Sequence, residues 1–201
     1  MTRAHPTRRP TQAERTAAMK QRLIDAAISS LIENGYAHTT SVEVCRRAGV
    51  TRGALNHHFA DLPALLIEVL ERIYADVAPA EQRDRPEPVE AMIRGAWKRL
   101  QRPEWKAVIE IWLAARNDPA LGTELAPAIA RLSALFDPLQ SRALAARLGS
   151  DPAQRTFYRL AAETMLGLAL GRAVSPAGKA VAHENEVMAL LTSLARRHAG
   201  R

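Results

Sequence analysis

Five residues of one short segment have the side chains and spacing needed to read nucleic acid: Thr51, Arg52, Gly53, Asn56 and His57. The segment predicts a short helix with these five on its outward face, opposite the apolar positions. Threonine and arginine can bond phosphates or base edges, and asparagine can pair with adenine through two hydrogen bonds. The glycine lets the backbone come close to its target. A helix inserted into the major groove of DNA presents such a group.

A glycine-centred turn must position this face. Two short helical patterns meet at Gly49, where a residue with a Cβ atom would be strained. Cys45, a small residue, stands four positions earlier, so the two helices can cross closely. Thr40 and Glu43 match a capping box at the start of the first helix, and Thr51 can cap the second. The apolar positions that would pack between the helices are Val44, Ala48, Val50, Leu55 and Phe59. The spacing therefore predicts a helix-turn-helix.

The composition places this motif in an all-α protein. The 201 residues are 47% apolar but only 4% aromatic, and strand formers are few. A net charge of +7 and a pI of about 10.3 indicate an anionic partner, either nucleic acid or a membrane surface. One cysteine excludes an intramolecular disulfide and a multi-cysteine zinc site. Since no membrane-spanning run or signal-peptide core is evident, we expect a cytoplasmic protein with no membrane partner.

Helix-breaking residues and the distribution of charge divide the sequence into three predicted parts: an arm, a head and a body. Residues 1–11 predict a basic flexible arm, which either follows the minor groove of DNA or stays solvated. Residues 12–77 predict a three-helix head with a connecting helix, and residues 78–201 predict an effector-binding and dimerisation body. About nine helices are expected, and the one at 120–148 should be interrupted near Pro127 or Pro138. The other helices of the body are expected at about 88–101, 104–117, 152–174 and 182–198.

The stretch from Gly35 to Leu65 resembles the tetracycline-repressor (TetR) family of bacterial regulators. The similar segments are Thr39-Thr40-Ser41-Val42, Arg47-Ala48-Gly49-Val50-Thr51, Arg52-Gly53-Ala54-Leu55 and His57-His58-Phe59. The resemblance implies a homodimeric repressor of double-stranded DNA whose body binds a small effector. By position, it implies that Thr40 touches a phosphate and that Thr51, Arg52 and Gly53 enter the groove. It also implies that His57 approaches the DNA backbone.

Two positions depart from the family pattern. The family usually has tyrosine where this chain has Asn56, and it favours lysine where this chain has Leu62. Asn56 either pairs with adenine or only solvates the helix end. Arg47 is a further candidate for DNA contact, although it could equally be a solvated surface residue.

The body offers candidates for an effector site and for a dimer interface. Aromatic and methionine side chains at helical spacing are usually core, but a cavity between helices would also be lined by them. The candidate ligand-binding residues are Trp97, Trp112, Arg116, Phe136 and Met165. The last two helices, about 152–174 and 182–198, have small residues such as Gly167 and Gly171 that allow close approach. They predict a four-helix dimer interface, or else an intrachain core.

Catalytic and metal chemistry find no support in the sequence. His57 and His58 are adjacent and diverge on a helix, so they cannot share a metal, and no nucleophile elbow or phosphate loop occurs. We therefore predict no catalytic residue, no metal and no cofactor. Cys45 is either a small core residue or a redox sensor. The predicted function is a repressor released by an effector; the alternatives are an activator or a helical small-molecule-binding protein with a non-functional head.

Overall fold

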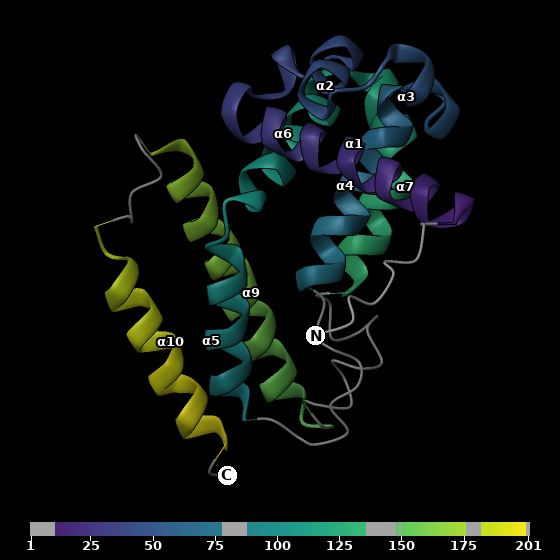
Figure 1. Ribbon diagram of the computed structural model, residues 1–201. Coiled ribbons are helices and arrows are strands. Elements are labelled where there is room, and N and C mark those ends of the chain that lie inside the picture. The colour runs from purple at the N-terminus through teal and green to yellow at the C-terminus, as the bar shows by residue number, and fades with distance from the viewer. Residues whose placement is uncertain (1–10, 78–87, 136–147, 149, 176–181, 200–201) are drawn as a thin grey trace, which may run out of the picture.

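The computed structural model describes residues 11–77, 88–135, 148, 150–175 and 182–199, and within these ranges it contains helices and no strand. This confirms the predicted all-α class (Figure 1). Of the parts predicted from the sequence, residues 1–10 of the arm and residues 78–87 at the start of the body lie outside the described residues. The helices are α1 (Gln12–Asn34), the 3-10 turn η1 (Tyr36–His38), α2 (Ser41–Ala48), α3 (Arg52–His58), α4 (Leu62–Val77), α5 (Val89–Leu100), α6 (Glu104–Asn117), α7 (Pro119–Leu135), α9 (Pro152–Val174) and α10 (Glu184–Ala199).

The capping boxes differ from the sequence prediction. At the predicted box, the backbone N–H of Glu43 donates to the Thr40 hydroxyl at 3.2 Å, which is one half of the motif. The Glu43 carboxylate turns to two arginines of its own helix instead, because guanidinium groups offer charge-assisted hydrogen bonds. A complete box forms at α1, where Thr11 and Glu14 exchange hydrogen bonds of 2.6 and 3.2 Å. The prediction is therefore right for the start of α2 and wrong for its reciprocal bond.

α7 continues through Pro127, so the predicted interruption at this residue is wrong. Proline removes one backbone donor from a helix and leaves a carbonyl of the preceding turn without its partner. Pro127 lies on the exposed side of α7, where that carbonyl can bond water. Pro138, the alternative position, lies outside the described residues.

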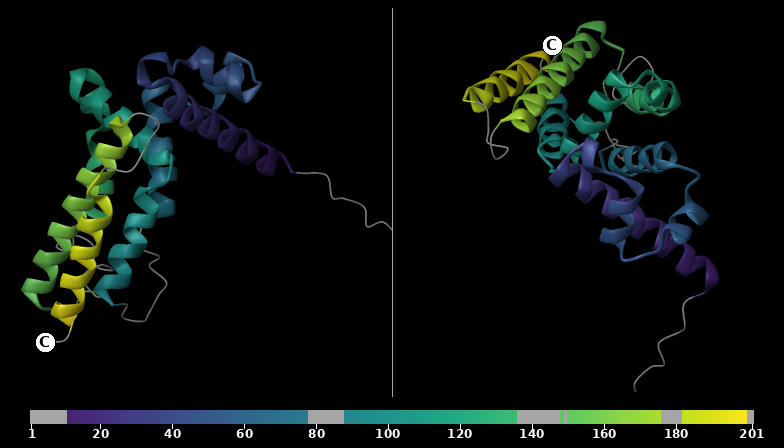
Figure 2. Two further views of the ribbon diagram at one scale, coloured as in Figure 1. Left: turned by 90° about the vertical axis from the view of Figure 1, so that its left-hand side faces the viewer. Right: turned by 90° about the horizontal axis from the view of Figure 1, so that it is seen from above.

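Two hydrophobic cores hold the helices together. The larger core joins the head to the body, since Leu31 of α1 and Leu66 of α4 share it with Ile111 of α6. The smaller one lies between α5, α9 and α10 and includes Trp97 and Tyr158. Figures 1 and 2 show these three helices side by side, apart from α1, α2 and α3. The packing therefore does not divide at residue 78, because α6 and α7 of the body pack on helices of the head.

No helix in the described ranges is long and apolar enough to cross a membrane.

Candidate nucleic-acid interface and body cavity

Gly49 forms the turn between α2 and α3. Its φ of 63° and ψ of 41° are left-handed, as the sequence predicts. The N–H of the next residue, Val50, donates to the carbonyl of Cys45 at 3.0 Å and closes the end of α2. Arg22 of α1 donates to the carbonyl of Ala48, the last residue of α2. The turn is thereby fixed against α1, and the direction of α3 follows from it.

α3 presents a polar face to solvent. Leu55 is buried, and the C-cap residue Phe59 is buried beside it, so both anchor the helix in the larger core. The N-cap residue Thr51 accepts a hydrogen bond from the N–H of Ala54 at 3.2 Å, and its own hydroxyl proton can still be donated. The remaining predicted residues, Arg52, Gly53, Asn56 and His57, are all exposed on this helix.

Gly53 is not required by the fold. A Cβ atom built at this position would meet only the Thr51 hydroxyl, at an ordinary 3.8 Å. Glycine within a helix costs about 0.5–1 kcal/mol relative to alanine. Close approach of a partner from outside the chain is a physical reason for a glycine here.

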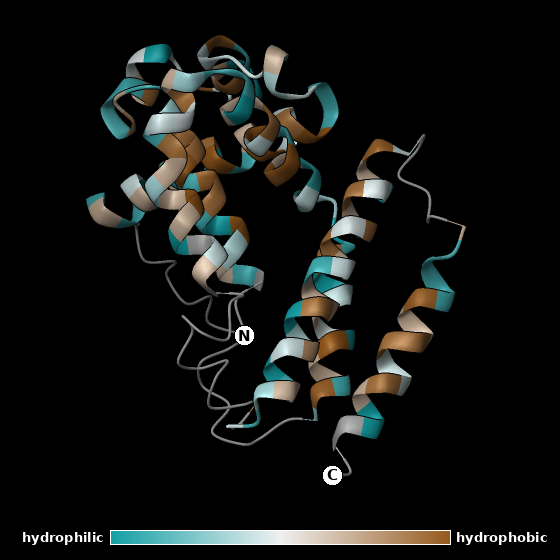
Figure 3. Ribbon diagram, turned by 180° about the vertical axis from the view of Figure 1, so that it is seen from behind, coloured by the Kyte–Doolittle hydropathy of each residue, from teal (hydrophilic) through white to brown (hydrophobic). Residues whose placement is uncertain are grey.

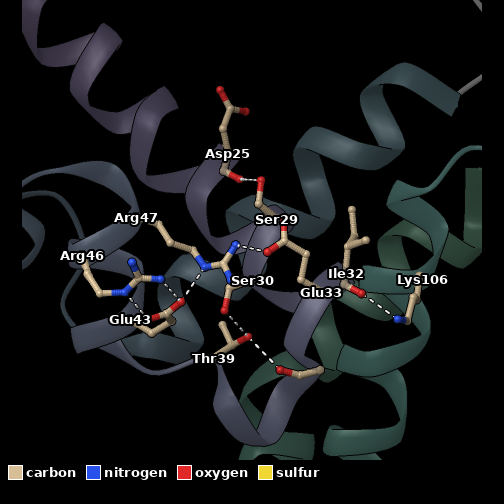
Figure 4. A network of polar contacts seen from close by, with 11 residues as sticks. Asp25, Ser29, Ser30, Ile32, Glu33, Thr39, Glu43, Arg46, Arg47 and Lys106 are labelled. Atoms are coloured by element: carbon tan, nitrogen blue, oxygen red, sulfur yellow. Dashed lines mark hydrogen bonds and ion pairs between the residues drawn. The ribbon is translucent and has the colours of Figure 1, made fainter.

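Arg47 is placed differently from the other predicted residues. Its guanidinium donates to Glu43 at 2.6 Å and to Glu33 of α1 at 2.7 Å, and only 16% of the side chain is exposed (Figure 4). It therefore ties α2 to α1. Its neighbour Arg46 is 67% exposed and pairs with Glu43 through both Nε and Nη2. By contrast, Arg52 forms no hydrogen bond or ion pair within the described part of the chain.

The two guanidinium groups change the acidity of Glu43. Hydrogen bonds from Arg46 and then Arg47 lower the pKa of this carboxyl from 4.5 to about 2. Glu43 is therefore ionised at neutral pH and holds both arginines in place. Thr40, the remaining predicted residue of the head, is exposed at the N-terminus of α2, where a helix favours negative charge such as a phosphate.

The two unusual positions of the head have different surroundings. Leu62 begins α4 and packs against the larger core, so its place in this chain is apolar and not a phosphate contact. Asn56 is exposed on α3 beside Arg52. Cys45 is buried, and desolvation raises the pKa of its thiol while Arg52 opposes the shift. A buried, protonated thiol favours the core interpretation of Cys45 over the redox one.

α6 also reaches the head, which the sequence did not reveal. Lys106 donates to the carbonyl of Ile32 in the last turn of α1 at 2.6 Å (Figure 4). One turn further along α6, Glu110 accepts from the backbone N–H of Tyr36 at 3.0 Å. In the sequence, these contacts are visible only as a lysine and a glutamate four positions apart on one helix. That spacing does not show which residues of the head they contact.

A cavity of about 420 Å³ lies in the body between α4, α5, α6, α7 and α9. Of the predicted ligand-binding residues, Trp112 and Met165 line it. Trp97 is buried in the smaller core, Arg116 is exposed near the end of α6, and Phe136 lies outside the described residues. Tyr74, Trp105 and Tyr158 also line the cavity and were not predicted to. Helical spacing could have predicted two of them. Trp105 stands seven residues before Trp112, and Tyr158 stands seven residues before Met165, so each pair shares one face of its helix.

A second hollow, of about 260 Å³, lies where α1, α4 and the α5–α6 connection meet. Four of its six charged residues form ion pairs with one another. Arg102 contacts Asp76 at 3.6 Å and Glu104 at 3.1 Å, and Arg72 contacts Asp76 at 2.5 Å. The larger, more apolar cavity is therefore the better candidate for an organic ligand. The described residues contain no cluster of three or more histidine, cysteine or acidic side chains that could hold a metal.

Comparisons with known proteins cover the head most closely. Residues 23–69 match the family described as "Bacterial regulatory proteins, tetR family". The HTH-type transcriptional regulator CymR of Pseudomonas putida is 32% identical over 120 residues, which are 57% of this chain and 59% of CymR. The HTH-type transcriptional regulator BetI of Cronobacter sakazakii is 26% identical over 113 residues, 51% of this chain and 56% of BetI. The chain thus spans little more than half the length of the curated relatives it matches.

Solved structures extend the likeness to the body. A transcriptional regulator from Rhodococcus sp. Rha1 superposes with a TM-score of 0.68 at 21% identity, covering 89% of this chain and 96% of that one, which shows the fold. The multidrug binding protein EbrR in complex with imidazole has a TM-score of 0.56 at 25% identity, covering 87% and 93% of the two chains. The helix-turn-helix geometry and the match over residues 23–69 show that the head is similar to the DNA-binding segment of the tetR family of bacterial regulatory proteins, and the solved structures show that the body has a similar fold.

Proposed function

We propose that this protein is a repressor that binds a palindromic operator as a homodimer and is released by a small-molecule effector. The observation that carries the proposal is the exposed polar face of α3, where Arg52 is unpaired within the described chain while Arg46 and Arg47 are engaged by carboxylates. An arginine held out from the surface without an internal partner is suited to a phosphate or a guanine edge.

The proposed contacts follow from this face. Thr51, Arg52, Asn56 and His57 reach the groove and its edges, while Gly53 admits the DNA close to the helix backbone. Thr40 binds a phosphate at the start of α2. We assign Arg47 to positioning α2 on α1, since two carboxylates already occupy its guanidinium.

The proposed dimer forms through α9 and α10. Large apolar side chains are exposed on these helices, at Leu160, Leu170 and Val174 of α9 and at Leu190 of α10. Apolar stretches recur along both helices in Figure 3. A Cβ atom at Gly167 would meet nothing within 4 Å, which leaves room for a partner helix to approach α9 closely. A second copy of the chain would cover this surface with a four-helix interface and align two α3 helices with successive major grooves.

The proposed effector site is the 420 Å³ cavity. EbrR, which has a similar fold, is described as a multidrug binding protein and has been solved with imidazole, proflavin and malachite green. In this chain α6 carries Trp105 and Trp112 of the cavity, and it also carries Lys106 and Glu110, which contact the end of α1. A ligand that favours another position of α6 would therefore alter the head, in proportion to its differential affinity for the two states.

Selection of bound DNA from a random pool tests this proposal. A palindromic consensus should emerge, and fluorescence anisotropy should then show that Arg52→Ala weakens binding at least about tenfold and flattens the salt dependence by about one unit of slope. Arg131→Ala is the matched control, because it removes the same charge from an exposed position of α7. Equal affinity of the Arg52→Ala protein and the wild type would refute the proposed interface.

A further inference from the structure

Two indole N–H groups in the body lack acceptors. Trp105 and Trp112 both line the 420 Å³ cavity, Trp105 also borders the 260 Å³ hollow, and both Nε1 atoms are buried without a hydrogen-bond partner in the described structure. Trp105 is only 5% exposed. Buried donors are nearly always paired in folded proteins, so two unpaired donors on residues that line the same cavity require an explanation. A ligand that brings its own acceptors provides one.

The rings are held in place by their neighbours. Trp105 meets Tyr74 edge-on, with ring centroids 5.7 Å apart, and meets Trp112 in the same manner at 6.2 Å. Such edge-to-face contacts fix the ring planes, so the indoles cannot readily turn toward another acceptor. Together with Met165, these rings give the cavity flat, apolar walls. The walls suit a flat, largely apolar molecule.

The charges at the cavity indicate that such a molecule is neutral. Among its described lining residues, the ionised side chains are Arg159 and Glu163, which have opposite signs and lie four positions apart on α9. Both are exposed, so water screens them and neither is a buried counter-ion. A charged ligand would lose its hydration in the cavity without gaining a buried partner.

We infer that the cavity binds an uncharged, flat, mainly apolar molecule with a carbonyl-type oxygen, which accepts a hydrogen bond from an indole N–H of the Trp105–Trp112 pair. This inference rests on the cavity being the effector site proposed above. It adds the chemical class of the effector: an aromatic ketone, ester or comparable neutral acceptor, in preference to a hydrocarbon, an anion or a cation.

Calorimetry with two probes of the same carbon skeleton tests the inference. 2-Acetylnaphthalene and 2-ethylnaphthalene differ by a carbonyl group in place of a CH₂ group. Hydrocarbon character alone would favour the ethyl compound, but pairing an orphan donor should make the acetyl compound bind about tenfold more tightly. Trp105→Phe or Trp112→Phe should abolish that preference. Trp97→Phe is the matched control, because Trp97 is buried in the smaller core and does not line the cavity.

The indole N–H signals of the wild-type protein give a readout that does not depend on variants folding. In ¹⁵N-correlated spectra, the acetyl compound should shift the signal of Trp105 or Trp112 downfield and leave that of Trp97 in place. Equal affinities for the acetyl and ethyl probes would overturn the acceptor inference and leave the cavity as a ligand site. Tighter binding of 2-naphthoate or proflavin than of the acetyl probe would overturn the neutral class. If none of the four probes bound, the proposed effector cavity itself would fail.

Discussion

Glu110 of α6 holds the start of η1 in the head, since its carboxylate accepts a hydrogen bond from the backbone N–H of Tyr36 at 3.0 Å. The two residues are 74 positions apart in the sequence. Lys106 makes a parallel contact to the carbonyl of Ile32, also 74 positions away. Two adjacent turns of one helix therefore clamp the end of α1, and the same helix lines the cavity with Trp105 and Trp112.

Removing the contact between Glu110 and Tyr36 should lower the stability of the protein and should reduce the effect of a cavity ligand on operator affinity. Glu110→Ala leaves the Tyr36 N–H without its partner, and we expect the free energy of unfolding to fall by about 1–2 kcal/mol. We also expect a cavity ligand to change operator affinity less in this variant than in the wild type. Urea denaturation and anisotropy with and without ligand measure the two effects. Glu124→Ala, at an exposed position of α7, is the control; full ligand response in Glu110→Ala would exclude a role for the clamp.

Gly53→Ala should separate folding from DNA binding. Because the new Cβ has open space, we expect the free energy of unfolding to rise by about 0.5–1 kcal/mol. We expect operator affinity to fall, because the methyl group keeps α3 away from the DNA. Gly95→Ala in α5 is the control, since its Cβ meets only the flexible end of Arg99 at 3.3 Å and lies in the body. Unchanged operator affinity in Gly53→Ala would rule out close approach at this position.

The ion pairs of Glu43 with Arg46 and Arg47 should make the stability of the head fall at acidic pH. The folded pKa of Glu43, about 2, lies below its usual 4.5, so its stabilising contribution is complete above about pH 4.5 and is lost as the pH falls toward 2. Arg47→Ala should make stability less dependent on pH in this window and should disturb operator binding less than Arg52→Ala does. The pH dependence of the urea midpoint and a carboxyl NMR titration of Glu43 check this. An unshifted Glu43 pKa in the wild-type protein would contradict the network.

Leu170→Glu should convert the proposed dimer to a monomer. The leucine is 45% exposed on the proposed interface of α9, and a carboxylate there would be buried against a second copy of the chain. Leu113→Glu is the matched control, because Leu113 is also 45% exposed but lies on α6. Sedimentation equilibrium at micromolar concentration should give half the mass for the first variant only. A monomeric wild-type protein would end the dimer proposal.

The sequence by itself determined the local structure of the head. The left-handed turn at Gly49, the N-caps at Thr40 and Thr51 and the outward position of Arg52 all depend on neighbours within a few residues, and spacing records such relations. Helix ends at prolines and glycines could be predicted for the same reason. Pro127 was the exception, because whether a helix tolerates a proline depends on which side faces solvent.

Only the tertiary structure decided which partners meet across the chain. The sequence could not show that Arg47 would be engaged by Glu33 of α1, or that Glu110 would contact Tyr36. It could not separate Trp97, which is buried in the smaller core, from Trp112, which lines the cavity. Helical periodicity marks the buried face of each helix, but the packing of whole helices determines what that face meets.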